Sequence, residues 1–132
     1  MTATRLPVPT EAQEQAALIS ACERLTPRIP ELALLFHIPN GGHRHKVVAA
    51  RLQAQGVKAG VPDLCLPVAR WGCHGLYIEL KRSKGGRVQV AQQQWLNQLD
   101  AEGYMALRCC GWTEALRAIL DYLGHSPQEF GL

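Results

Sequence analysis

An α/β fold, with a mixed central sheet flanked by helices, is the fold class that this chain predicts. Short apolar runs of strand length alternate with longer segments of helical periodicity, and Pro or Gly separates most of them. Strands interleaved with helices are typical of a central sheet covered by helices. The predicted elements, in the order αβαββαβα, are a helix over 10–25, a strand over 33–38, a helix over 43–55, strands over 62–68 and 75–82, a helix over 90–101, a strand over 104–109 and a helix over 113–123.

The first helix has a sequence signature at each end. Thr10 is a good N-cap, and Gln13 follows three residues later as in a capping box. Pro27 and Pro30 end the helix because proline lacks the N–H that a helix interior needs. Residues 33–38 then form a purely apolar run apart from one His, which predicts a buried strand.

A turn at 39–42, with the sequence PNGG, separates that strand from the second helix, which stops at Gly56. The short Gly-containing connection at 70–75 predicts that the strands on either side of it are antiparallel. The third helix ends before Gly103, and Gly111 precedes the last helix.

Length and composition predict a single soluble domain. The 132 residues are 47% hydrophobic and 19% charged, and they suffice for one domain over 10–124. We expect a flexible arm over 1–9 and a frayed tail over 125–132. No apolar run approaches 18 residues and no leader pattern is present, so we expect no membrane contact and a cytoplasmic location. Five cysteines without a CxxC pattern predict free thiols.

The candidate site begins with two carboxylates on neighbouring strands. In the strand over 75–82, Tyr77, Glu79 and Lys81 alternate with apolar residues and therefore share one face. Asp63 follows Pro62, which belongs at the start of a strand because it cannot donate to the ladder. Two carboxylates can hold a hard divalent cation, and a Lys beside them can polarise a nucleophile. This combination suits phosphodiester cleavage.

Two helices place a polar residue on an apolar face. Glu14 shares a face with Leu18 and Ala21, and Gln92 shares one with Leu96. A Glu among apolar side chains is costly to bury unless a cation or a donor meets it. Glu14 and Gln92 therefore join the candidate site, although a boundary position explains Glu14 taken alone.

Other patterns carry less weight. His43 and His45 diverge by about 200° on a helix, so with His37 they do not form a convincing zinc site. The Gly pair at 85–86 lacks the GxxxxGK[ST] pattern, so no nucleotide cofactor is expected. Basic segments flank the acidic residues, which suits a polyanionic substrate. The residues assigned to DNA contact are Asn40, His43, Arg44, Lys46, Lys58, Arg82, Lys84 and Arg87.

The chain resembles the PD-(D/E)xK nuclease superfamily and, within it, the stand-alone VRR-NUC family of phages and prophages. The resemblance runs from about residue 10 to 123 and implies a restriction-endonuclease-like fold. The stretches that carry it are 38–42 (IPNGG), 56–63 (GVKAGVPD), 75–81 (GLYIELK) and 92–95 (QQQW).

The resemblance also implies a role for each matching residue. Asp63, Glu79 and the carbonyl of Leu80 ligate Mg²⁺ or Mn²⁺, and Lys81 assists the attacking water. Glu14 completes the metal site, with Glu11 as an open alternative, and Gln92 steadies it. The implied function is a homodimeric endonuclease that resolves four-way DNA junctions. A flap or linear-duplex nuclease, a non-catalytic DNA-binding module and an unrelated α/β domain remain alternatives.

Overall fold

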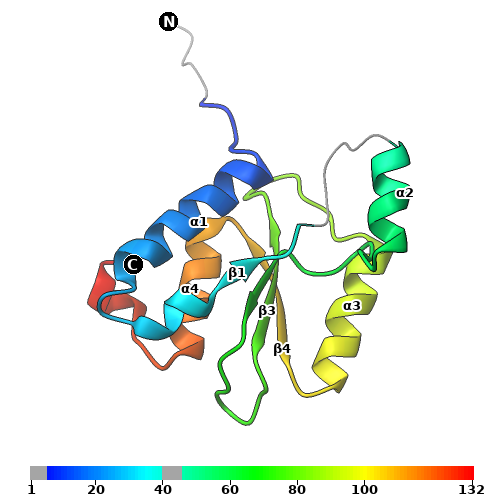
Figure 1. The fold of residues 1–132 in the computed structure, drawn as a ribbon. Helices are drawn as coiled ribbons and strands as arrows, with labels where there is room; N and C mark the ends of the chain where they lie inside the picture. The colour runs from blue at the N-terminus through cyan, green and yellow to red at the C-terminus, as the bar shows by residue number, and fades with distance from the viewer. Residues whose placement is uncertain (1–5, 40–45) are drawn as a thin grey trace, which may run out of the picture. The chain divides into compact units, whose positions relative to one another are not determined.

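The computed structural model describes residues 6–39 and 46–132 and has a four-stranded sheet flanked by helices (Figure 1). The strand order is β1-β2-β3-β4, and the element order confirms the α/β prediction. The elements are α1 (Glu11–Leu25), η1 (Pro30–Leu34), β1 (Phe36–His37), α2 (Lys46–Ala54), β2 (Leu64–Leu66), β3 (Leu76–Lys81), α3 (Val90–Ala101), β4 (Met105–Cys110), α4 (Trp112–Tyr122) and η2 (Pro127–Phe130).

The sheet is mixed. β1 pairs antiparallel with β2, and β2 pairs antiparallel with β3 as predicted. Between β3 and β4, the N–H of Met105 donates to the carbonyl of Gly75, and the N–H of Gly111 donates to that of Lys81, each at 2.8–2.9 Å. The sequence offset between donor and acceptor is the same in both bonds, which is the pattern of parallel strands.

The chain divides into two compact units, and β3 and β4 each contribute residues to both. Unit 1 comprises the described residues up to Ala33, then Leu80–Arg87 and Arg108–Leu132; unit 2 comprises the described residues of Leu34–Glu79 and Val88–Leu107. No helix in the described part of the chain is long and apolar enough to cross a membrane.

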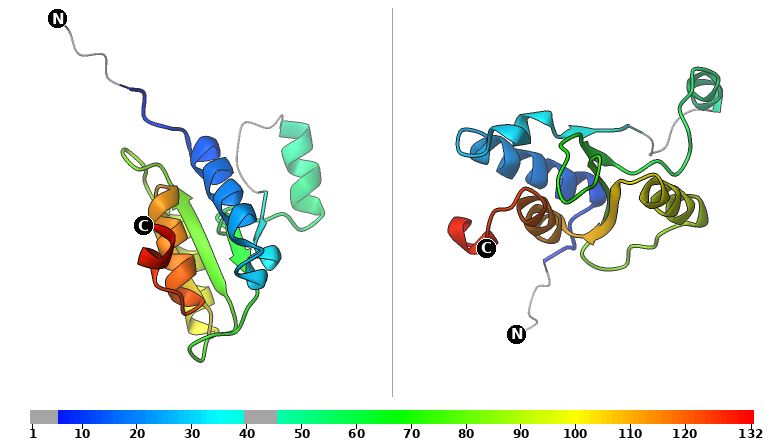
Figure 2. Two further views of the ribbon diagram at one scale, coloured as in Figure 1. Left: turned by 90° about the vertical axis from the view of Figure 1, so that its left-hand side faces the viewer. Right: turned by 90° about the horizontal axis from the view of Figure 1, so that it is seen from below.

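Unit 1 is organised around α1 and α4, which pack against each other (Figure 2). Leu18 of α1 and Ile119 and Leu120 of α4 are completely buried. The C-terminal residues, expected to be frayed, instead form η2, and the guanidinium of Arg28 lies 4.5 Å from the ring centroid of Phe130. This cation–π contact links η2 to the turn after α1.

The predicted buried strand over 33–38 is wrong in length and in burial. The 3-10 turn η1 begins at Pro30 and takes the first residues of the run, so only Phe36 and His37 form a strand. Because β1 is an edge strand with β2 on one side only, the Phe36 side chain stays 50% exposed. An apolar run alone cannot distinguish an edge strand from a central one.

β2 is shorter than predicted because prolines flank it, and the loop before it is tightly packed. Gly60 has φ of +89°, and a Cβ atom there would lie 2.8 Å from the main-chain carbon and oxygen of Ala91 in α3. The loop that leads to Asp63 therefore approaches α3 more closely than any other residue type permits.

Gly60→Ala should lower the free energy of unfolding by more than the approximately 1–2 kcal/mol that a left-handed alanine costs, because the new methyl group meets main-chain atoms. Gly56→Ala is the matched control, since Gly56 also has positive φ but nothing lies within 4 Å of its Cβ position. Urea denaturation of both variants measures the difference. Equal losses would show that the approach to Ala91 is looser than the structure indicates.

The five cysteines are all free thiols, as predicted. Burial, followed by the charge of Glu23, raises the pKa of Cys22 from 9.0 to about 11. Burial, followed by the charges of Glu114 and Cys110, raises the pKa of Cys109 from 9.0 to about 12. Both thiols are therefore protonated and unreactive at neutral pH.

These two thiols should make the protein less stable in alkali. Their pKa values are higher in the folded chain, so folding favours the protonated thiols. The contribution of the two thiols to the free energy of unfolding is therefore complete below pH 9 and is lost as the pH rises through 11–12. Urea denaturation at pH 8 and pH 10 should show the decrease. A Cys22→Ala, Cys109→Ala variant should show a smaller decrease, and an identical one would refute the assignment.

Candidate active site

The register of β2 and β3 brings two carboxylates of unit 2 together. Leu64 lies opposite Ile78 and Cys65 opposite Tyr77, so the next position places Asp63 opposite Glu79. Directly opposed residues of antiparallel strands point to the same face, with Cβ atoms about 4.5–5.5 Å apart. The register, extended by one residue, therefore sets the two carboxylates on one face.

Asp63 is positioned through its main chain. Its carbonyl oxygen accepts a hydrogen bond of 2.7 Å from the N–H of Ile38 and lies 2.8 Å from Nδ1 of His37. The preceding loop is anchored to α3, since Nε1 of Trp95 donates to the carbonyl of Ala59 at 3.1 Å. Contacts with β1 and α3 thus fix the main-chain position of Asp63 and of the loop before it.

Glu79 is buried, with only 2% of its surface exposed. Its Oε1 accepts a hydrogen bond of 3.1 Å from Nε2 of Gln92, and Oε1 of Gln92 accepts one of 2.9 Å from the N–H of Gln89 at the start of α3. Gln92 is therefore held at both ends of its amide. The start of α3 therefore orients the Gln92 amide, and the Gln92 amide orients the Glu79 carboxylate.

Lys81 provides a buried cation in unit 1. It is 5% exposed, and its Nζ lies 3.6 Å from Oε1 of Glu11. Alternation along β3 places Lys81 and Glu79 on the same face of that strand. Lys81 therefore pairs with Glu11 of α1, the residue that the sequence left open as the alternative to Glu14.

Glu14 contacts the start of α4. It is 5% exposed, and its Oε2 accepts a short hydrogen bond from the N–H of Trp112, the first residue of α4. A carboxylate at a helix N-terminus is stabilised by the helix dipole and by the unpaired N–H groups there. Gly111 leaves room for it, because a Cβ atom at that position would lie 3.3 Å from Oε2 of Glu14. The sequence signal for this contact is the glycine that precedes α4.

The donor set suits a hard divalent cation. Asp63 and Glu79 supply carboxylate oxygens, which are the ligands that Mg²⁺ and Mn²⁺ prefer, and Mg²⁺ keeps several waters of its own. Within residues 6–39 and 46–132, no group of three or more His, Cys, Asp or Glu side chains gathers around one point. Two carboxylates with main-chain and water oxygens are therefore the arrangement to test.

The residues assigned to DNA contact occupy different surroundings. Asn40, His43 and Arg44 lie outside the described residues. Lys46 and Lys58 are exposed in unit 2, and Lys84 and Arg87 are exposed in unit 1. The guanidinium of Arg82 donates to the carbonyls of Pro9 and Val8 at 3.3 and 3.4 Å, so this side chain contacts the N-terminal segment.

Comparison with known proteins identifies the family. The model of the VRR-NUC domain matches residues 10–112, which is most of the chain. The chain belongs to the VRR-NUC domain family. A solved structure described as a VRR_NUC domain protein is 28% identical, with a TM-score of 0.76 over 92% of this chain and 93% of the other. The comparison with curated proteins found no match.

The VRR-NUC domain is a nuclease domain with DNA as substrate, so the chain is a member of a nuclease family. The matched region includes Asp63, Glu79, Lys81, Gln92 and Glu14. The same residues supply the opposed carboxylates, the amide that holds one of them, the buried cation and the cap of α4. All five residues therefore lie within the segment that the family match covers.

Glu14→Ala should destabilise the VRR-NUC domain by about 1–3 kcal/mol, because the N–H of Trp112 loses its acceptor in a partly buried environment. Glu14→Gln keeps an oxygen acceptor and should lose less. Glu11→Gln removes the charged partner of the buried Lys81 ammonium, so it should also lower the free energy of unfolding. Urea denaturation measures all three.

Binding of Mn²⁺ to the same variants separates the two roles of Glu14. If Glu14 only caps α4, Glu14→Gln should bind Mn²⁺ with the affinity of the unmodified protein in a calorimetric titration. A large loss of affinity in a stable Glu14→Gln protein would establish Glu14 as a metal ligand.

Proposed function

We propose that this protein is a metal-dependent, structure-specific DNA endonuclease that resolves four-way junctions as a homodimer. The observation that carries the proposal is the opposed pair Asp63 and Glu79, with Glu79 buried and held by Gln92. Burying a carboxylate is costly, and a site for a divalent cation is one of the few uses that justify the cost.

Asp63, Glu79 and the carbonyl of Leu80 would hold Mg²⁺ or Mn²⁺. The bound ion supplies two effects, a lower pKa of a coordinated water and compensation of negative charge on the phosphate. Gln92 keeps the Glu79 carboxylate oriented through its hydrogen bond to Oε1. Fixed ligands of this kind reduce the reorganisation that the site must undergo when the substrate arrives.

Lys81 would act on the nucleophile and on the phosphate. Its ammonium orients the attacking water and stabilises charge that develops on the non-bridging oxygens. The contact with Glu11 limits the positions of its flexible side chain. The water oxygen bonds to phosphorus, the bond from phosphorus to the 3′ oxygen breaks, and the products are a 3′-hydroxyl and a 5′-phosphate.

A homodimer suits a two-fold symmetric junction, because paired cuts need two active sites related by a two-fold axis. The support for this part of the proposal is the resemblance to stand-alone VRR-NUC proteins. A flap or linear-duplex nuclease uses the same residues without the symmetry requirement, so substrate choice distinguishes the two.

Incubation with labelled junction, flap and linear duplex tests the proposal. The unmodified protein should cut the junction in paired symmetric positions with Mg²⁺ or Mn²⁺ and should be inactive in EDTA. Asp63→Asn, Glu79→Gln and Lys81→Met should each lose about 100-fold or more in cutting rate, while junction binding persists. Gln92→Ala should slow cutting, whereas Gln93→Ala, which alters an exposed neighbour, should not.

Each contrary result has a defined meaning. Equal cutting of flap or duplex would remove the junction preference and keep the nuclease site. Binding without cutting in either metal would assign the protein to the non-catalytic class. Unfolding of all three variants would overturn the assignment of Asp63, Glu79 and Lys81 to chemistry.

A further inference from the structure

α2 is a helix without a buried residue. All of its nine residues are at least partly accessible, and the side chains of Val47 and Val48 are 59% and 45% exposed. A helix of this length has little stability of its own in water, because nucleation is costly and few hydrogen bonds follow it. A helix that its own domain covers so little is suited to contact a partner.

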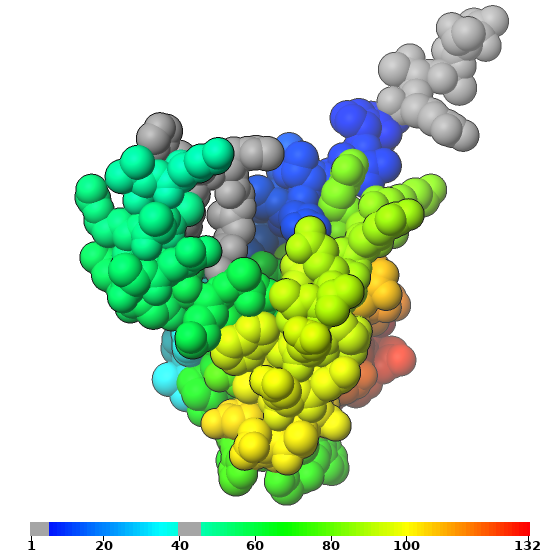
Figure 3. All heavy atoms as spheres, turned by 90° about the vertical axis from the view of Figure 1, so that its right-hand side faces the viewer, coloured from blue at the N-terminus to red at the C-terminus, as the bar shows by residue number. Residues whose placement is uncertain are grey.

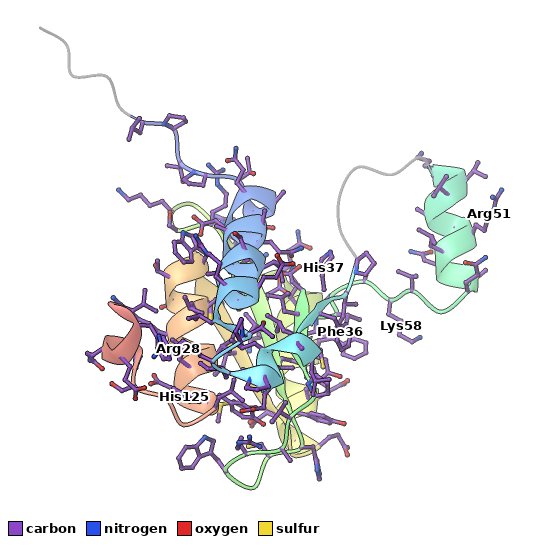
Figure 4. The ribbon with its side chains drawn as sticks, turned by 60° about the vertical axis from the view of Figure 1, so that its left-hand side comes forward. Arg28, Phe36, His37, Arg51, Lys58 and His125 are labelled. Carbon is purple, nitrogen blue, oxygen red and sulfur yellow. The ribbon has the colours of Figure 1, made fainter. Side chains whose placement is uncertain are left out.

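The exposed side of α2 carries short apolar side chains and two positive charges. At 100° per residue, one arc of about 140° contains Lys46, Ala50, Ala54, Val47 and Arg51. These five residues, called here the α2 face, are all exposed, whereas Ala49 and Leu52 on the other side are half-buried. Figure 3 shows α2 open on the surface, and Figure 4 shows Arg51 pointing away from the rest of unit 2.

The charge around the α2 face is of one sign. No Asp or Glu occurs between Glu31 and Asp63, and Lys58 follows α2 closely. Contact between the α2 faces of two copies would place four cations together without an acidic residue to compensate them. A polyanion, in contrast, supplies the missing negative charge along its whole length.

We propose that the α2 face docks on the sugar–phosphate backbone of the DNA substrate, independently of base sequence. This inference rests on the proposed nuclease function. Lys46 and Arg51, separated by about 7.5 Å along the helix axis, contact phosphates. Ala50 and Ala54 permit a close approach but have no donors or acceptors for base edges, so the contact positions the substrate without reading its sequence.

The test measures binding without cleavage, in EDTA, by fluorescence anisotropy of a labelled four-way junction and a duplex of about 30 base pairs, the length of about three turns. Lys46→Gln, Arg51→Gln should weaken binding to all sequences alike. Loss of two phosphate contacts should reduce the slope of log K against log salt by about 1.8. Lys46→Arg, Arg51→Lys, which keeps both charges, should retain most of the slope.

Arg24→Gln, Arg117→Gln is the matched control, because it removes two exposed cations from the helices α1 and α4. Its salt dependence should equal that of the unmodified protein. An unchanged slope in the α2 variant, or an equal change in the control, would overturn the inference. So would conversion of a dimer to a monomer by Val47→Glu, measured by light scattering, because that result makes the α2 face a contact between copies.

The experiment separates this inference from the proposed function. If the unmodified protein cuts junctions and the α2 variant binds like it, the docking surface is refuted and the nuclease stands. If the α2 variant loses the predicted slope while the unmodified protein cuts nothing in Mg²⁺ or Mn²⁺, the docking surface stands and the nuclease is refuted.

Discussion

The antiparallel register of β2 and β3 is the constraint on which the candidate site depends. Leu64 lies opposite Ile78, and this register extended by one residue sets Asp63 opposite Glu79. The apolar side chains of both strands are buried in the core. A slip of one residue would exchange the faces of every side chain in the strand. The burial of Leu64, Leu66 and Ile78 therefore stabilises the fold and aligns the carboxylates at the same time.

Buried charged side chains are the second constraint, because each of them needs a partner. Glu79, Glu14 and Lys81 are each no more than 5% exposed, so each needs a partner to offset the loss of hydration. Gln92 donates to Glu79, the start of α4 donates to Glu14, and Glu11 pairs with Lys81. These contacts tie helices to the residues that the proposed chemistry uses, so mutations in α1 or α3 should affect activity through position.

The α2 segment follows a different principle. Most of the elements around the carboxylates have a buried face, whereas α2 has none and presents cations and small side chains to solvent. The same division is common in enzymes that act on polymers, where a rigid centre holds the chemistry and a charged surface holds the substrate. Stability and binding can then change independently.

Sequence pattern alone determined the element order, the limits of α3 and the antiparallel pairing of β2 with β3. It also selected Asp63, Glu79, Lys81 and Gln92 as candidates for the site. It could do so because alternation, helical periodicity, caps and glycines are local signals. The tertiary structure decided that residues 33–38 give only an edge strand, that Glu11 meets Lys81 and that Glu14 caps α4. Those outcomes depend on which elements become neighbours, and periodicity within one helix contains no information about the partner of each polar residue.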